Sequence, residues 1–169
     1  MSDFDGLASI DAIVMDVDGV LTDGTFLWDE SGGESKRFSF EDVMGLSCAR
    51  KAGLTLGLIS GEESVLVDRF AVKVGISHIA KGCKNKGAAL RNFAEVTRIP
   101  LARIAFIGDD VNDLPALAIA GLSVAPANAQ PPVKAAAALV LDRSGGQGAV
   151  RQLVEMILAA RTPLIDAIR

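Results

Sequence analysis

The stretch that determines the fold is IDAIVMDVDGVLTDG, residues 10–24, in which an apolar segment runs directly into two aspartates. Its first part, IDAIVM, is nearly continuous in apolar residues and has the length of a strand, which is typical of a strand buried on both faces. Asp16 and Asp18 follow one residue apart, before glycine and polar residues. Like charges at the end of a core strand repel each other, so a functional reason for them is expected.

Apolar segments of similar character recur along the chain and alternate with stretches of helical periodicity. Further strands are predicted at 54–60, 102–108, 121–126 and 138–142. Helices are predicted at 43–52, 62–74, 86–97, 111–119 and 147–160, with a short one from 128 or 129 to 137. This alternation favours an α/β fold, a parallel sheet covered by helices on both faces, in which ligands bind beyond the carboxyl ends of the strands. Without a linker or repeat, residues 1–169 are expected to form one domain.

Composition excludes several classes of function. The 169 residues carry a net charge of −4, which argues against general nucleic-acid binding, because neutralising phosphates needs a basic face. No apolar run approaches the ~20 residues of a membrane span. The acidic N-terminus does not resemble a signal peptide, and the two cysteines lack CxxC spacing, so a cytoplasmic protein with reduced thiols is expected.

Residues 25–40 interrupt the strand–helix alternation. Two short alternating runs flank the sequence SGG, which predicts a β-hairpin directly after the DVDG turn. The segment holds a large share of the aromatic side chains: Phe26, Trp28, Phe38 and Phe40. Because an isolated hairpin is only marginally stable, this one is expected to pack on something, a second subunit being one option.

A second acidic group follows another predicted strand, at Asp109, Asp110 and Asp113 in GDDVND. If the two strands are neighbours in the sheet, these carboxylates meet Asp16 and Asp18 at one edge. Their mutual repulsion would amount to several kcal/mol at modest separations, and a divalent cation would remove it. Oxygen ligands supplemented by water favour Mg²⁺ over zinc.

The residue types also suit phosphoryl transfer. Asp16 is a possible nucleophile that forms an acyl phosphate, and Asp18 a possible acid and base. Ser60 follows a predicted strand and offers a hydroxyl to phosphate oxygens, while Lys84 and Lys86 precede or open a helix and offer positive charge. Alone, a serine in a turn or a lysine at a helix start is ordinary; with the aspartates, in this order, they indicate a phosphoryl-transfer site.

With these residues in view, the chain resembles the haloacid dehalogenase (HAD) superfamily phosphatases. DVDG, Ser60, Lys86 and GDDVND match the four motifs of that superfamily, and the resemblance extends from about residue 10 to about residue 160. It implies a Rossmann-like core with Asp16 as nucleophile and Asp18 as acid/base. It also implies that Ser60 and Lys86 bind the phosphoryl group, with Lys84 the weaker choice of the two lysines.

The same resemblance implies a Mg²⁺ site. Asp16, the backbone carbonyl of Asp18, and Asp109 would hold the ion. Asp110 and Asp113 would support it.

The resemblance narrows to a capless family, the 3-deoxy-D-manno-octulosonate 8-phosphate phosphatases. Neither the interval before helix 43–52 nor the one between Ser60 and Lys86 is long enough for a cap domain. Relatives act on nine-carbon sugar-acid 9-phosphates or are fused to acylneuraminate cytidylyltransferases. The family implies a homotetramer in which neighbouring subunits close each active site. Arg151, after the GGQG segment, would then contact the substrate carboxylate of a neighbour; otherwise it is a solvated helix residue.

One departure bears on the substrate. The octulosonate enzymes typically have ISGR, whereas this chain has ISGE with Glu62, and Lys73 stands where the nine-carbon relatives have a lysine. Arginine grips a carboxylate through two N–H bonds, but glutamate repels it and accepts from hydroxyls. The pattern therefore favours a nine-carbon sugar-acid phosphate, with the eight-carbon ester as the alternative. A simpler interpretation is that Glu62 stabilises the first turn of a helix.

Two rival classes share part of this pattern. A signalling receiver domain also uses aspartates, Mg²⁺ and a lysine, but its phosphorylated aspartate lies alone in mid-chain. A non-catalytic tetramerisation module, like a cytidylyltransferase C-terminal domain without activity, would have no reason to keep repelling carboxylates.

Overall fold

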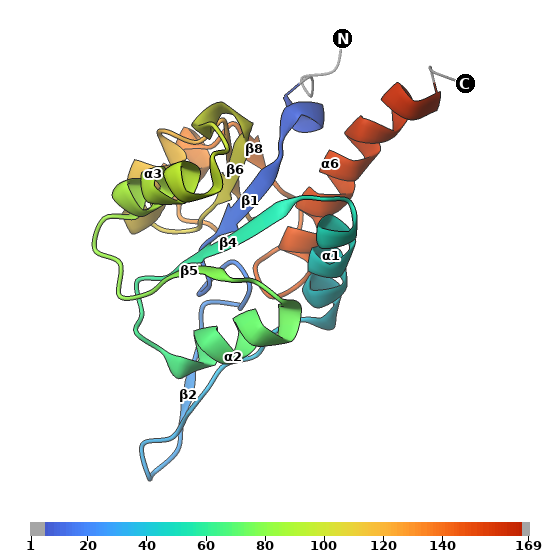
Figure 1. Ribbon diagram of the computed structural model, residues 1–169. Coiled ribbons are helices and arrows are strands. Elements are labelled where there is room, and N and C mark those ends of the chain that lie inside the picture. Colours follow the sequence, from blue (N-terminus) through green and yellow to red (C-terminus); the bar gives the residue numbers. More distant parts are fainter. Residues whose placement is uncertain (1–5, 167–169) are drawn as a thin grey trace.

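The centre of the computed structural model is a parallel sheet of six strands in the order β5-β4-β1-β6-β7-β8 (Figure 1). The structure describes residues 6–166. The strands are β1 (Ala12–Met15), β4 (Thr55–Ile59), β5 (His78–Ala80), β6 (Ile104–Ile107), β7 (Leu122–Ala125) and β8 (Leu139–Val140). All the predicted strands are present, and β5 is an additional one at the sheet edge.

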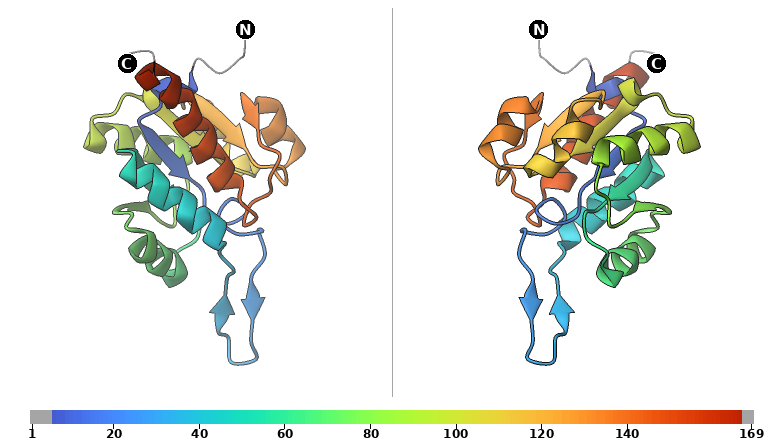
Figure 2. Two further views of the ribbon diagram at one scale, coloured as in Figure 1. Left: turned by 90° about the vertical axis from the view of Figure 1, so that its right-hand side faces the viewer. Right: turned by 90° about the vertical axis from the view of Figure 1, so that its left-hand side faces the viewer.

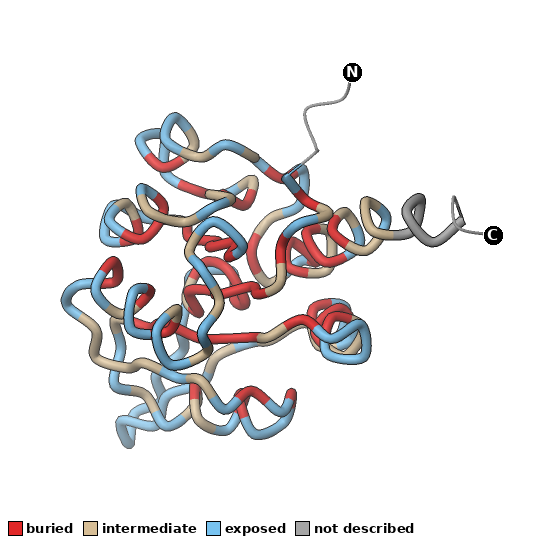
Figure 3. Tube along the Cα trace, turned by 45° about the horizontal axis from the view of Figure 1, so that its top comes forward, coloured by how far each residue is buried: buried red, intermediate tan, exposed pale blue. Residues whose placement is uncertain are grey.

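Helices cover both faces of the sheet, as the alternating pattern predicted. One face packs against α1 (Phe40–Lys51), α2 (Val65–Val74) and α6 (Ala149–Asp166). The other packs against α3 (Lys86–Thr97), α4 (Leu114–Leu117) and α5 (Pro131–Ala136). Short 3-10 turns complete the fold: η1 (Leu7–Ser9), η2 (Leu101–Arg103) and η3 (Val111–Asp113). Because the central strands are covered twice, their residues are buried along their whole length (Figure 3).

Helix starts differ from the predicted ones because of serine caps. The Ser39 hydroxyl accepts from the Glu41 amide at 3.1 Å, so α1 begins earlier than expected. The Ser64 hydroxyl accepts from the Leu66 amide at 3.2 Å, so α2 begins later. The segment predicted as one helix at 111–119 is instead η3 followed by the single turn of α4.

The start of α6 is held by a side chain of α1. Buried Asp42 accepts a hydrogen bond from the Arg151 amide at 3.0 Å. Gly45 permits this close approach, since a Cβ there would lie 2.9 Å from the Arg151 Cα. Burial raises the pKa of Asp42, and this effect outweighs the hydrogen bonds from amides at the start of α6, which lower it.

The predicted hairpin is present, with β2 (Leu27–Trp28) paired to β3 (Glu34–Ser35). It projects from the carboxyl ends of the sheet strands, where the site lies (Figure 2). Phe26 and Trp28 contact each other, with ring centroids 4.8 Å apart. Their neighbour Leu27 is 68% exposed and Trp28 is 70% exposed. Within the described part of this one chain, therefore, β2 does not find the packing partner that the sequence led us to expect.

In the part of the chain that the structure describes, helices are too short or too polar to cross a membrane.

Candidate active site

The two acidic groups meet because their strands are neighbours. β1 and β6 pair in parallel, with Met15 opposite Ile107, so the residues that follow them emerge at the same edge. Carboxylate oxygens of Asp16, Asp109 and Asp113 lie within 4.8 Å of one another. The condition for convergence stated from the sequence is thus met.

The close approach of the two loops requires a glycine at position 19, in DVDG. Gly19 has φ of +84°, and a Cβ built on it would lie 2.0 Å from an Asp109 carboxylate oxygen. Buried Thr22 fixes the loop by accepting hydrogen bonds from the amides of Gly19 and Gly24, both at 3.2 Å. Any larger residue at position 19 would push Asp109 away from Asp16.

Lys86 lies among these carboxylates with 1% of its side chain exposed. Its ammonium lies 2.8 Å from Asp16 and 2.6 Å from Asp113. Burial alone disfavours the charged lysine, but attraction to the two aspartates outweighs it and raises the pKa of Lys86. The N-cap Asn85 places Lys86 at the first turn of α3.

Asp113 already has partners for both oxygens. One faces Lys86, and the other accepts from the amides of Asp109 at 2.9 Å and Asp110 at 3.2 Å. Asp113 therefore ties the GDD loop to Lys86, which leaves Asp16 and Asp109 as the better placed metal ligands.

The electrostatics of the cluster fit a cation. Burial, and then the charge of Asp113, raises the pKa of Asp16 to about 8. The same two causes raise the pKa of Asp109 to about 6. The described part of the chain gathers three carboxylates here, and the ammonium of Lys86 pairs with two of them, Asp16 and Asp113. A hard divalent ion bound by Asp16 and Asp109 would supply the missing positive charge.

A cavity of about 460 Å³ opens over this cluster. The residues expected at the site that line it are Asp16, Asp18, Glu62, Lys86, Asp109 and Asp110. Ser60 is buried at the end of β4, next to cavity-lining Gly61, and its hydroxyl accepts from the Glu62 amide at 3.1 Å. Glu62 precedes the cap of α2, so it is not the first-turn residue that the simpler interpretation required.

Three other residues considered from the sequence lie outside the cavity of this chain. The Lys73 ammonium lies 5.4 Å from the centroid of the Phe40 ring, in a separate depression between α1 and α2. Arg151 pairs with Glu155 at 2.5 Å on the surface of α6. Lys84 is exposed and lines no part of the cavity.

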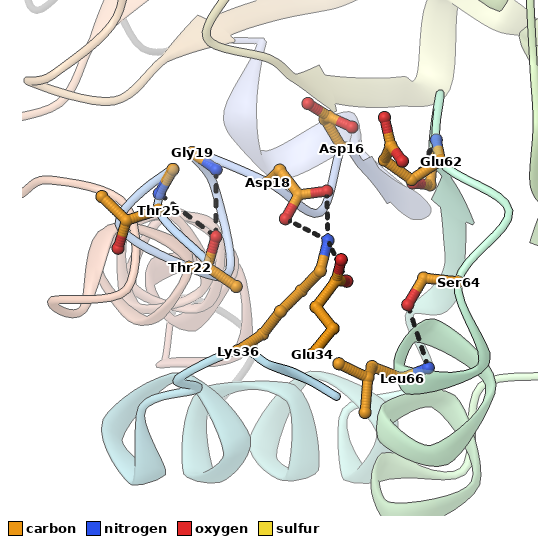
Figure 4. A network of polar contacts seen from close by, with 12 residues as sticks. Asp16, Asp18, Gly19, Thr22, Thr25, Glu34, Lys36, Glu62, Ser64 and Leu66 are labelled. Carbon is orange, nitrogen blue, oxygen red and sulfur yellow. Dashed lines mark hydrogen bonds and ion pairs between the residues drawn. The ribbon is translucent and has the colours of Figure 1, made fainter. Parts of the chain in front are cut away.

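Several cavity residues were missed by sequence reasoning, namely Phe26, Trp28, Glu34, Lys36 and Asn112. Four of them belong to the hairpin or its base, which was identified, but not as a wall of the site. The most notable is Lys36, whose ammonium pairs with Asp18 (Figure 4). The local signal was weak, since a lysine in a short polar strand is usually solvated.

Fold and site together define the class of protein. In order along the chain, the parallel strands are arranged 3-2-1-4-5-6, and the acidic groups follow the first and fourth. A receiver domain has the order 2-1-3-4-5, so that rival is wrong. A family model described as haloacid dehalogenase-like hydrolase matches residues 62–153. The chain has the fold of a HAD-like hydrolase.

Relatives narrow the class. The Escherichia coli (strain K12) 3-deoxy-D-manno-octulosonate 8-phosphate phosphatase KdsC is 35% identical over 159 residues, 94% of this chain and 85% of the relative. The crystal structure of the phosphatase of that name from Yersinia pestis has a TM-score of 0.92 and 34% identity, covering 95% of this chain and 87% of the other. The Moraxella catarrhalis phosphatase, solved with magnesium, phosphate and 3-deoxy-D-manno-octulosonate (KDO), has a TM-score of 0.91 and 35% identity, covering 98% and 97%.

The chain therefore belongs to the capless KDO 8-phosphate phosphatase family of HAD-like hydrolases. It is a phosphoric monoester hydrolase, which removes the non-catalytic module from consideration.

Proposed function

We propose that this protein hydrolyses KDO 8-phosphate with Mg²⁺, through a phosphorylated Asp16. The observation that carries the proposal is the buried Asp16 carboxylate at the floor of the cavity, 2.8 Å from the Lys86 ammonium and beside Asp18 and Asp109. A nucleophile, a fixed positive charge and a second carboxylate thus face one space, as transfer of a phosphoryl group from a monoester requires.

The reaction would take two steps. An Asp16 oxygen attacks phosphorus, the bond from phosphorus to the sugar oxygen breaks, and Asp18 gives that oxygen its proton. A water oxygen then attacks the phosphorus, Asp18 takes the proton of the water, and the bond to Asp16 breaks to release phosphate. Lys86 would face the developing negative charge throughout both steps. Ser60 and the Gly61 segment would donate hydrogen bonds to phosphate oxygens.

The proposed Mg²⁺ ligands are Asp16, Asp109 and the backbone carbonyl of Asp18, with Asp110 and Asp113 in support. When bound, the ion would neutralise the phosphate oxygens and keep Asp16 ionised despite its raised pKa. The Moraxella catarrhalis relative contains a magnesium ion, and a Haemophilus influenzae relative that is 36% identical was solved with cobalt.

The eight-carbon substrate replaces the nine-carbon one that the ISGE sequence favoured. Curated relatives at 34–35% identity carry the octulosonate name, and they match 94–95% of this chain. The nine-carbon ester stays a second candidate because Glu62 lines the cavity, where its carboxylate can accept from sugar hydroxyls. Lys73 lines a different depression of this chain, so in this proposal it would act from another subunit.

We also propose that the chain forms a homotetramer. The exposed apolar side chains of the hairpin strand β2, Leu27 and Trp28, support an additional partner surface. A neighbouring subunit would shield the open cavity from water, in the way that a cap domain does in other enzymes. Arg151 of such a neighbour is then a possible contact for the substrate carboxylate.

The experiment is a measurement of phosphate release with Mg²⁺ from eight- and nine-carbon ulosonate phosphates, with Asp16→Asn as the control. A higher kcat/KM for KDO 8-phosphate supports the proposal. A clear preference for the nine-carbon ester would favour that ester as the substrate instead. Equal activity of wild type and Asp16→Asn would rule out Asp16 as the nucleophile.

A further inference from the structure

Lys36 enters the cavity from the base of the hairpin. Its side chain turns from the strand end toward the DVDG loop, and only 4% of it is exposed (Figure 4). The ammonium lies 2.6 Å and 2.8 Å from the two oxygens of Asp18. A carboxylate of Glu34 lies at 4.0 Å, farther than either.

This contact differs from an ordinary surface ion pair. Exposed pairs contribute little, because two long side chains lose freedom and water screens the charges. Here the side chain of the lysine is almost fully buried, while Asp18 keeps 31% of its side chain exposed toward the cavity. The burial fixes Lys36, and the two hydrogen bonds then fix the plane of the Asp18 carboxylate.

Asp18 depends on this lysine for its orientation. Within the described residues, the hydrogen bonds to its side chain come from Lys36. By contrast, Asp113 is held by Lys86 and two backbone amides. An acid/base must reach both the leaving oxygen and the attacking water, so free rotation of Asp18 would reduce both proton transfers.

We propose that Lys36 is a positioning residue, through which the hairpin orients the acid/base Asp18. The inference rests on the proposed function, in which Asp18 protonates the leaving oxygen. It makes the hairpin part of the catalytic apparatus, because the side chain that holds the Asp18 carboxylate comes from the hairpin base.

The test compares substrates whose leaving groups need protonation to different degrees. KDO 8-phosphate releases an alkoxide, which requires an acid, whereas an aryl phosphate with an acidic phenol does not. Lys36→Met should lower kcat/KM for KDO 8-phosphate by about 10- to 100-fold, within the range of general acid catalysis, and affect the aryl phosphate much less. Lys36→Arg should recover part of the loss.

A double-mutant cycle on KDO 8-phosphate tests whether the effect passes through Asp18. In an Asp18→Asn background, Lys36→Met should cause less than about a 2-fold further loss, since the residue that it orients is gone. Lys81→Met is the matched control, because Lys81 also pairs closely with an aspartate, Asp68 at 2.7 Å, but away from the cavity. Thermal unfolding of each variant shows that it is folded.

Two results would overturn the inference. In one, Lys36→Met lowers kcat/KM as much in the Asp18→Asn background as in wild type. In the other, Lys36→Met raises KM and leaves kcat unchanged. Either result would make Lys36 a direct substrate contact. These differ from failure of the proposed function, in which Asp16→Asn would be as active as wild type, or wild type would release no phosphate.

Discussion

At the scale of single residues, the buried Asp16 carboxylate is destabilised in its ionised form without a cation. Asp16 directly follows β1, a strand buried on both faces, and burial raises its pKa to about 8. The unfolded chain ionises this group near pH 4, so between about pH 4 and pH 8 the folded state binds the extra proton. Stability of the metal-free protein should therefore fall as the pH rises through that window.

Asp16→Asn removes that contribution. We expect the metal-free variant to be more stable than wild type by about 2 kcal/mol at pH 8, with a difference close to zero near pH 4. Urea unfolding at the two pH values, with chelator present, measures it, and saturating Mg²⁺ should reduce the difference. A variant less stable than wild type at pH 8 would show that Asp16 is not strained.

Cation binding should be coupled to proton release. Below about pH 8 the metal-free protein carries a proton on Asp16, and below about pH 6 one on Asp109 as well. The apparent Kd for Mg²⁺ should rise about 10-fold per unit as the pH falls from 8 to 6, and more steeply below. Calorimetric titrations in buffers of different ionisation enthalpy count the protons released. A Kd that is constant from pH 6 to pH 8 would contradict the assignment of ligands.

At the scale of elements, the site depends on a close approach between the DVDG loop and the GDD loop, which leaves no room for a side chain at Gly19. Gly19→Ala would place a methyl group against Asp109, at a position with φ of +84°. We expect kcat/KM to fall at least about 100-fold and Mg²⁺ affinity at least about 10-fold. Gly53→Ala is the matched control: Gly53 has φ of +82° but open space around its Cβ position, so it should lose about 1 kcal/mol of stability and no activity. Equal activity losses in the two variants would mean that backbone strain, not contact with Asp109, is responsible.

A second element-scale prediction concerns α6, whose start is capped by a residue of α1. Asp42→Ala should lower the free energy of unfolding by about 1–2 kcal/mol, because the Arg151 amide loses its acceptor. Asp42→Asn keeps an acceptor oxygen and should lose less. Denaturant midpoints of the two variants compare them, and equal losses would mean that the charge, not the hydrogen bond, stabilises the helix.

The elements show where the sequence was informative. IDAIVM and ARIAFI predicted β1 and β6 because strands covered on both faces must be apolar throughout. β5 was missed because it is three residues at the sheet edge, with Ile79 partly exposed and His78 polar. The start of α1 was placed too late because the cap at Ser39 was overlooked.

The site, too, was predictable from the sequence only in part. The convergence of Asp16, Asp18 and Asp109 was predicted on the condition that their strands are neighbours, and the pairing of β1 with β6 meets that condition. The position of Lys36 could not be predicted, because nothing in its local sequence says that the hairpin base turns back over the DVDG loop. The separation of Lys73 from Glu62, by contrast, is the one that helix geometry indicates, because eleven residues correspond to about three helical turns.

At the scale of the whole molecule, the cavity is open and the hairpin beside it exposes apolar residues. If β2 of the hairpin contacts other subunits, Leu27→Asp should shift the protein to smaller species, because charge at an apolar interface is costly. Val96→Asp is the control, since Val96 is comparably exposed, at 63%, on α3. Sedimentation at equal concentrations compares them. An unchanged mass in Leu27→Asp, with wild type tetrameric, would place the interface elsewhere.

The most direct test of the whole account is to look for the phosphoryl group on Asp16. Wild type mixed with KDO 8-phosphate and Mg²⁺ is quenched in acid within a turnover, and its peptides are weighed by mass spectrometry. We predict one added phosphoryl group on the peptide containing Asp16, which disappears when Mg²⁺ is replaced by chelator and is absent in Asp16→Asn. Rapid hydrolysis by a wild type that carries no label at all, or carries it on another residue, would contradict the account.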